Sequence, residues 1–191
     1  MKNFKKKIIL EKKLLTDCLD NLCSSKLDYF EDLCNESMKA IKNKKKIILF
    51  GNGGSAADAQ HLATELTVKY KKKRKPLPAI SLATDNSALT AIGNDFSFKQ
   101  IFSRQIEALG NKGDIVLGIT TSGNSENILE AFKSANKLSI KNYCFVGNNG
   151  GSVIKYCKKP IIFPKTTTSI TQVMQIFLGQ IYCEFLEESF F

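Results

Sequence analysis

Five short apolar segments recur along the chain and alternate with longer segments of helical periodicity. The short segments are KIILF (46–50), PAISLA (78–83), DIVLGI (114–119), NYCFV (142–146) and PIIF (160–163). A fully apolar strand is typical of a parallel sheet that is covered on both faces. Parallel neighbours need crossover connections, which are usually helices. The alternation therefore predicts an α/β sandwich with a parallel sheet as its middle layer.

Helical periodicity also precedes the first apolar segment and follows the last. Apolar residues recur at helical spacing over residues 8–22, over 30–41 and over roughly 168–188. The sequence has no internal linker, repeat or low-complexity boundary, and 191 residues with 43% hydrophobic content suit one core. We therefore predict a single domain over residues 1–191, with two leading helices at about 4–43.

Cysteine usage and hydropathy indicate the compartment. The six cysteines show no CxxC spacing, and most lie in apolar surroundings, as buried thiols of a reducing compartment do. Their positions are Cys18, Cys23, Cys34, Cys144, Cys157 and Cys183. No apolar run approaches the ~20 residues of a membrane span. These features predict a cytoplasmic protein that does not associate with a membrane.

The net charge of +10 raises the question of a nucleic-acid partner. The segment KYKKKRK (69–75) concentrates basic residues, but lysines are strewn along the rest of the chain as well. No basic platform with interleaved aromatic residues accompanies the segment. Nucleic acid is therefore not the expected partner, whereas a small acidic substrate would benefit from the positive field.

The stretch FGNGGSAADAQHLATEL (50–66) follows the first apolar segment directly. Its glycines permit a tight turn and a close approach of the backbone to a ligand, and Ser55 is a good N-cap for the helix that follows. Helix N–H groups at such a turn bind anions. A glycine-rich turn without any ligand is the structural alternative, so this stretch alone does not decide.

A second turn, in GITTSGNSENILEAF (118–132), places clustered hydroxyl groups between a buried segment and an amphipathic helix. Hydroxyl groups and a helix N-terminus together can hydrogen-bond phosphate oxygens. Two such turns at the carboxyl edge of one parallel sheet predict a ligand crevice. The chain lacks the P-loop lysine and the GxGxxG order, so a phosphorylated small molecule is expected rather than a nucleotide.

His61 and Glu65 lie four residues apart and therefore share one face of the predicted helix. An ordinary exposed pair is the structural alternative. Close to a phosphate loop, a carboxylate can abstract a proton next to a carbonyl group, and an imidazole can bind a metal or polarise an oxygen.

Three motifs together resemble the SIS (sugar isomerase) domain family, and within it the bacterial phosphoheptose isomerases. They are GNGGSAADAQHLATEL, AIGNDFSFKQIFSRQIEALG and TTSGNSENILEA. The resemblance implies a five-stranded parallel sheet of flavodoxin-like topology between helices, and a homotetramer with active sites at subunit interfaces. It implies interconversion of sedoheptulose 7-phosphate and D-glycero-D-manno-heptose 7-phosphate, which supplies heptose for lipopolysaccharide or capsule.

The resemblance also assigns roles to residues. Glu65 matches the catalytic carboxylate that moves a proton between C1 and C2 through an enediol. His61, Glu65, Gln172 and position 180 match ligands of a zinc ion. The residues that would contact substrate, besides Glu65, are Asn52, Gly53, Gly54, Ser55, Asn94, Asp95, Thr120, Thr121, Ser122, Ser125 and Gln172.

The last helix departs from the family pattern. Gln180 stands where the family has its acid/base histidine, and the family's arginine, glutamate and first histidine are replaced by Ile170, Val173 and Gln175. An amide cannot transfer a proton near neutral pH, and losing a proton-transfer group typically costs ~10²–10⁴ in rate. Either another group or water substitutes, or the chain is an inefficient isomerase with a degraded zinc site.

Two alternatives remain at this point. One is a non-catalytic SIS protein, a tetrameric regulator that binds a phosphosugar or the initiator of DNA replication. The other is isomerisation of a different phosphosugar. The retained His61 and Glu65 and the intact phosphate loops favour the heptose isomerase.

Overall fold

A five-stranded, all-parallel sheet forms the middle layer of the computed structural model, which describes residues 3–24 and 27–191. The strand order is β2-β1-β3-β4-β5. The strands are β1 (Ile47–Gly51), β2 (Ala79–Ser81), β3 (Ile115–Thr120), β4 (Lys141–Val146) and β5 (Lys159–Ile162). The predicted α/β class and flavodoxin-like topology are therefore confirmed, with each predicted apolar segment forming one strand.

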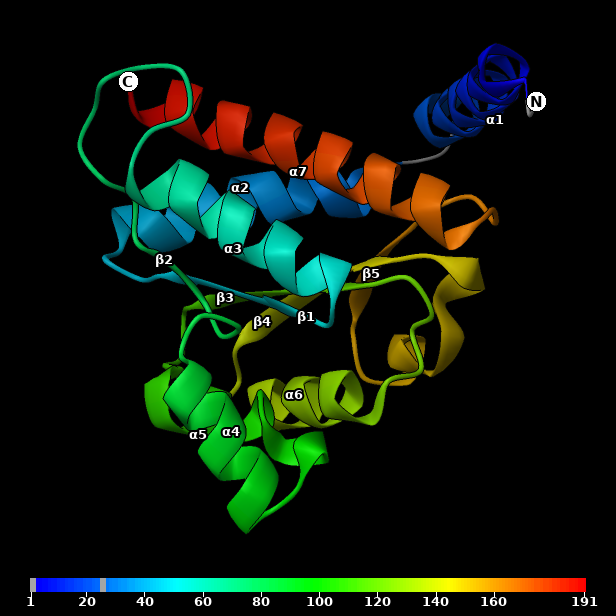
Figure 1. Cartoon of the computed structure of the whole chain (residues 1–191). Coiled ribbons are helices and arrows are strands. Elements are labelled where there is room, and N and C mark those ends of the chain that lie inside the picture. The colour runs from blue at the N-terminus through cyan, green and yellow to red at the C-terminus, as the bar shows by residue number, and fades with distance from the viewer. Residues whose placement is uncertain (1–2, 25–26) are drawn as a thin grey trace.

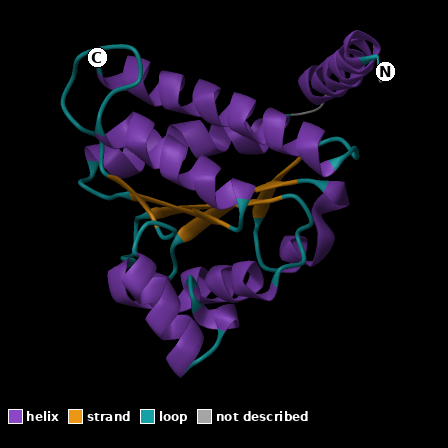
Figure 2. Ribbon diagram, viewed as in Figure 1, coloured by secondary structure: helices purple, strands orange, loops and turns teal. Residues whose placement is uncertain are grey.

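Helices cover both faces of this sheet (Figure 1). One face carries α2 (Asp28–Lys42), α3 (Gly54–Thr67) and α7 (Thr168–Phe190), whereas α1 (Phe4–Ser24) contacts α7 and projects away from the sheet. The other carries α4 (Asn86–Asp95), α5 (Ser103–Leu109) and α6 (Glu126–Lys137), with the short 3-10 helices η1 (Phe98–Gln100) and η2 (Asn148–Lys155) completing the chain. Figure 2 shows the three layers in cross-section, with the strands between the two helical layers.

Burial explains why the strands read as continuous apolar runs. All residues of β1 and β3 are buried, and Ile47 of β1 pairs in register with Ile115 of β3. Side chains alternate between the two faces of a strand, so each strand feeds two cores. Leu49 belongs to the core under α3 and α7, whereas Ile48 belongs to the core over α5 and α6.

The start of α3 differs from the prediction. Ser55 is not the N-cap, because Gly53 occupies that position with a φ of 55° and no side chain caps the helix. Ser55 lies in the first turn and is buried. Only glycine adopts this φ readily, so the backbone turn of Gly53 takes the place of the expected serine cap.

None of the helices in the described ranges combines the length and the apolarity that crossing a bilayer requires.

Candidate active site

Asn52, the first residue after β1, is tied to the second loop through a pair of side-chain hydrogen bonds. Its Nδ2 donates to Oδ1 of Asn127 at 2.9 Å, and Nδ2 of Asn127 donates back to Oδ1 of Asn52 at 2.8 Å. Asn127 lies in the first turn of α6 and is buried. The amide pair fixes the two predicted loops relative to each other. Sequence reasoning missed Asn127. The available signal was an amide residue at the start of the helix that follows the hydroxyl-rich turn.

A cleft of about 460 Å³ opens beside this amide pair. Its lining comprises Asn52, Ser97, Phe98, Lys99, Ser125, Glu126 and Asn127. The cleft lies where β1 and β3 adjoin, which is the point in this strand order where connections diverge and where open α/β sheets bind ligands. The structure therefore brings the two predicted loops to one crevice.

Internal hydrogen bonds shape the loop from Thr120 to Ser125. Oγ1 of Thr120 accepts from the backbone N–H of Gly123 at 3.2 Å. Gly123 has a φ of 67°, and a Cβ there would lie 2.2 Å from the carbonyl oxygen of Gly150 in η2. Only glycine fits such a close approach in this backbone conformation. The loop is thus held in one shape, which exposes hydroxyl groups and N–H groups to a ligand.

Two glutamines of α7 reach this edge of the sheet. A Cβ on Gly54 would lie 2.4 Å from Nε2 of Gln172, so the amide of Gln172 covers the start of α3. Nε2 of Gln175 donates to the carbonyl oxygens of Thr120 and Phe145, each at 3.0 Å. Its Oε1 is buried and finds no hydrogen-bond partner among the described residues. Gln175 therefore ties α7 to the phosphate loop, a role that the sequence did not reveal.

A second cluster lies farther along α3 and α7. Nε2 of His61 lies 3.0 Å from Oε1 of Glu65, and Nε2 of Gln180 lies 3.2 Å from the same imidazole nitrogen. The His61 side chain is 52% exposed, and that of Glu65 is 21% exposed. The structure thus confirms that His61 and Glu65 share a helix face and places Gln180 against them.

Asp58 adds a third polar residue to this face of α3, three residues before His61. Partial burial raises the pKa of its carboxyl group, although the nearby His61 opposes the shift. An α-helix brings residues i and i+3 together, so Asp58 increases the negative charge beside the imidazole when it is ionised.

Within one chain, no described contact joins the start of α3, where Gln172 lies, to the cluster of His61, Glu65 and Gln180. An α-helix rises about 1.5 Å per residue, so Glu65 lies about 16 Å along α3 from Gly54. By the same measure Gln172 lies about 12 Å along α7 from Gln180. No contact in the described residues joins His61 or Glu65 to the crevice at Asn52 and Asn127, so the expectation that they flank it stays a prediction.

Asn94 and Asp95 form a third group. They end α4, on the face of the sheet opposite α3 and α7 (Figure 1). Both are exposed, and Nδ2 of Asn94 donates to Oδ1 of Asp95 at 2.8 Å. The two residues are therefore separated by the sheet from Glu65 and Gln180 of the same chain.

The donor atoms of one chain do not fit a zinc site. Zinc in proteins takes nitrogen, sulfur and carboxylate ligands in tetrahedral sets. The described residues contain no group of three or more histidine, cysteine, aspartate or glutamate side chains placed to hold a metal. His61 and Glu65 supply two suitable donors, and Gln180 supplies an amide. The amide of Gln172 lies at the start of α3, and no described contact joins it to His61 or Glu65.

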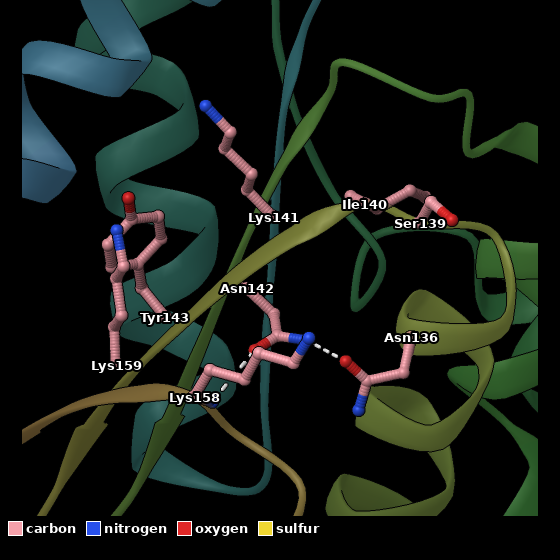
Figure 3. Close-up of a pocket in the computed structure, with 8 residues that line it drawn as sticks. All are labelled: Asn136, Ser139, Ile140, Lys141, Asn142, Tyr143, Lys158 and Lys159. Atoms are coloured by element: carbon pink, nitrogen blue, oxygen red, sulfur yellow. Dashed lines mark hydrogen bonds between the residues drawn. The ribbon is translucent and has the colours of Figure 1, made fainter.

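A different hollow, of about 350 Å³, lies at the amino ends of β4 and β5 (Figure 3). Asn142 donates to Oδ1 of Asn136 at 2.8 Å. Lys159 pairs with Asp32 at 2.6 Å, and Lys141 pairs with Glu36. Most polar groups here already have partners, and parallel sheets bind ligands at the other edge. This hollow is therefore not the candidate active site.

Comparison with known protein families identifies the family of this chain. A model of the SIS domain matches residues 13–147 of the chain. The chain belongs to the SIS domain family. This membership confirms the family that the three motifs predicted.

Two relatives of this SIS-domain chain are both named phosphoheptose isomerase. Phosphoheptose isomerase from Nitratiruptor sp. is 50% identical over 153 residues, covering 80% of this chain and 82% of that protein. Phosphoheptose isomerase from Clostridium acetobutylicum is 43% identical over 196 aligned positions, covering 100% of this chain and 97% of that protein.

Solved SIS-domain structures match along nearly the whole chain. Phosphoheptose isomerase from Neisseria gonorrhoeae has a TM-score of 0.91 and 33% identity, covering 97% of this chain and 100% of that one. The isomerase from Francisella tularensis has a TM-score of 0.93 and 30% identity, covering 97% and 99%. The three-layer fold is thus that of phosphoheptose isomerase structures.

Proposed function

We propose that this chain is a phosphoheptose isomerase, which interconverts sedoheptulose 7-phosphate and D-glycero-D-manno-heptose 7-phosphate. The observation that carries the proposal is the hydrogen-bonded pair of His61 and Glu65 on α3, in a chain whose relatives named phosphoheptose isomerase are 43–52% identical. A carboxylate held by an imidazole suits proton abstraction next to a carbonyl group.

The hydroxyl-rich loop from Thr120 to Ser125 suits the phosphate end of the sugar. Ser125 of this loop and the first two residues of α6, Glu126 and Asn127, line the cleft, and Lys99 lines it as well. Lys99 pairs with Glu126 at 3.0 Å, and both side chains are well exposed. A phosphate group can therefore compete with Glu126 for the ammonium group, since exposed ion pairs are weak.

Glu65 acts on the carbon atoms. Its carboxylate removes a proton from C1 of the ketose, the C1–H electron pair forms the C1–C2 double bond, and the C2 carbonyl oxygen gains a proton to give an enediol. Glu65 then returns its proton to C2 as the O1 proton departs, which gives the aldose. The carbon-to-carbon transfer needs one group that is a base and then an acid.

The oxygen atoms need a separate proton carrier, because O1 loses a proton and O2 gains one. Gln180 cannot fill this role, since an amide does not ionise near neutral pH. His61 is the chain's only imidazole and lies against both Glu65 and Gln180. We assign His61, with a water molecule where the distance requires it, to the oxygen-to-oxygen transfer.

The active site is proposed to be shared between copies of the chain in a homotetramer. No described contact joins the cleft at Asn52 and Asn127 to the His61 cluster of the same chain, and the Asn94–Asp95 pair lies across the sheet from that cluster. An exposed apolar stripe runs along α7 beside Gln180, formed by Val173, Phe177, Ile181 and Phe185. Large exposed apolar patches mark association surfaces, and covering this stripe with a second copy brings loops of that copy towards Glu65.

Three finer features complete the proposal. Zinc binds weakly, because His61 and Glu65 are the only strong donors in the described cluster, and the reaction above does not require it. The enzyme acts in the cytoplasm, which accords with six unpaired cysteines, of which five are buried. Its product supplies heptose for surface polysaccharide such as lipopolysaccharide or capsule.

The decisive experiment is an assay of the purified chain with sedoheptulose 7-phosphate, with and without zinc. We expect aldose formation by the wild type and none by Glu65→Gln, since an amide cannot accept the proton. Phosphosugar binding without turnover would instead support the non-catalytic regulator. That alternative is not favoured, because the relatives that match at 43–52% identity are named as isomerases.

A further inference from the structure

The carboxylate of Glu187, near the end of α7, is buried and accepts hydrogen bonds from four donors. Glu187 accepts hydrogen bonds from the backbone N–H groups of Tyr70, Lys71 and Lys72 at 3.0, 2.8 and 2.7 Å. Nε of Arg74 donates to its Oε2 at 2.8 Å. The two charged side chains are 1% and 2% exposed, so this ion pair is removed from water.

The remaining donors of the Arg74 guanidinium reach the end of α3. Nη2 donates to the backbone carbonyl oxygen of Glu65 at 2.8 Å, and Nη1 donates to that of Leu66 at 2.9 Å. The last carbonyl groups of a helix lack partners within the helix. The Arg74 side chain thus donates hydrogen bonds to two of these carbonyl groups. Its positive charge is also favourable at the negative end of the helix dipole.

We propose that Arg74, held in place by Glu187, is a positioning residue for the catalytic carboxylate of Glu65. The inference rests on the isomerase function proposed above. It gives Arg74 the role of holding Glu65 in position from outside the group of reacting residues. Arg74 connects the backbone of Glu65 on α3 to Glu187 on α7, and α7 also carries Gln180. The guanidinium therefore fixes the carboxylate-bearing turn of one helix relative to the helix that faces it.

The geometry requires arginine. Three acceptors from other elements meet the guanidinium, namely a carboxylate oxygen and two successive helix carbonyl oxygens, and Nη1 also donates to the carbonyl oxygen of the neighbouring Lys75 at 3.0 Å. A planar fork of five N–H groups satisfies them together, whereas the single ammonium group of lysine cannot reach all three. A small displacement of a reacting group costs up to about 100-fold in rate, so the loss of this fork lowers turnover without touching the substrate.

Kinetics of Arg74→Lys and Arg74→Ala test the proposal. We expect kcat to fall about 10- to 100-fold while KM changes little, because substrate contacts remain. Ethylguanidinium at millimolar concentration should restore part of kcat in Arg74→Ala, and ethylammonium at the same ionic strength should not. The matched control is Glu184→Gln, which breaks the exposed Lys71–Glu184 pair on the same loop and should leave kcat unchanged.

A spectroscopic arm separates positioning from stability. The chain contains one histidine, so a protein without a histidine tag gives one set of imidazole signals in a ¹H–¹³C NMR spectrum. At fixed pH, and below the unfolding transition, Arg74→Lys should shift the His61 signals, whereas Glu184→Gln should not.

Unchanged His61 signals in folded Arg74→Lys, or a kcat loss no larger than its unfolded fraction, would overturn the positioning role. If the wild type shows no turnover, the proposed function fails, and the NMR comparison alone still decides whether Arg74 positions this turn.

Discussion

Gln180 presents its amide to Nε2 of His61 at 3.2 Å, and the same imidazole nitrogen lies 3.0 Å from Oε1 of Glu65. When Glu65 is ionised, Nε2 of His61 carries a proton and donates it to the carboxylate. A nitrogen that donates cannot also accept from an N–H group. Nε2 of Gln180 therefore donates to this nitrogen only in the tautomer that carries the ring proton on Nδ1, so Glu65 and Gln180 compete for the same imidazole nitrogen.

The first prediction is that Gln180→His speeds the reaction. An imidazole at this position provides an ionisable group against His61 and Glu65, and such groups contribute about 10²–10⁴ in rate. We expect kcat on sedoheptulose 7-phosphate to rise by at least tenfold. Ser189→His, an exposed position on the same helix, is the control and should have no effect. A fast wild type with a neutral or harmful Gln180→His change would mean that the chemistry has been rebuilt around another residue.

The second prediction concerns zinc. An imidazole is a better zinc ligand than an amide, so Gln180→His should tighten zinc binding about tenfold or more, which is about 1.4 kcal/mol. Calorimetric titration with zinc measures this without any activity assay, and it applies equally to variants with two histidines or none. His61→Ala should abolish binding in both backgrounds. Equal zinc affinity in the wild type and Gln180→His would show that position 180 is no ligand.

The third prediction addresses the phosphate loop. The double substitution Ser122→Ala and Ser125→Ala removes two hydroxyl groups from the loop, of which that of Ser125 lines the cleft, and should weaken phosphosugar binding by about 1–3 kcal/mol. Calorimetry with sedoheptulose 7-phosphate, using Glu65→Gln to prevent turnover, measures the change. Ser189→Ala is the matched control. Unchanged affinity would remove these hydroxyl groups from the phosphate site.

Local sequence patterns were enough to predict the strands and helices. The apolar runs of β1 and β3 are continuous because these strands are buried on both faces, whereas the edge strand β5 leaves Ile162 exposed. The Ser55 cap was wrong because an N-cap preference describes side chains, whereas this turn is made by the backbone of Gly53. The resemblance supplied the strand order, which periodicity alone does not determine.

The site was harder to predict because its parts meet through tertiary contacts. Spacing on one helix placed His61 beside Glu65, and the loops reached one cleft through the Asn52–Asn127 pair. No local pattern indicates that Arg74 reaches Glu187, since 113 residues separate them in the chain. In the sequence, Arg74 is the single arginine in a run of lysines, and no local pattern indicates that its side chain is buried.

The fourth prediction is that the chain is a tetramer held partly by the α7 stripe. Phe177 lies in this stripe and is 46% exposed. Helix α4 is a second exposed surface, since none of its ten residues, all of which the structure describes, is buried. Phe177→Glu should therefore yield smaller assemblies and lower turnover, because burying an unpaired charge at an interface is costly. Light scattering at micromolar concentration gives the mass, and Lys137→Glu on α6 is the control. A monomeric wild type that is fully active would contradict the shared site.

The fifth prediction concerns the pH dependence of stability at Glu187. Burial opposes ionisation of this carboxyl group, but three backbone N–H groups and Arg74 outweigh it and lower its pKa from 4.5 to about 2. A lowered folded-state pKa stabilises the protein at pH values above 4.5, and this contribution is lost as the pH falls towards 2. The shift corresponds to about 3 kcal/mol at neutral pH.

Urea unfolding from pH 3 to pH 7 should therefore show a steeper pH dependence for the wild type than for Glu187→Gln, with Glu184→Gln resembling the wild type. Parallel curves for the wild type and Glu187→Gln would mean that the carboxylate is no better stabilised in the folded chain than in water.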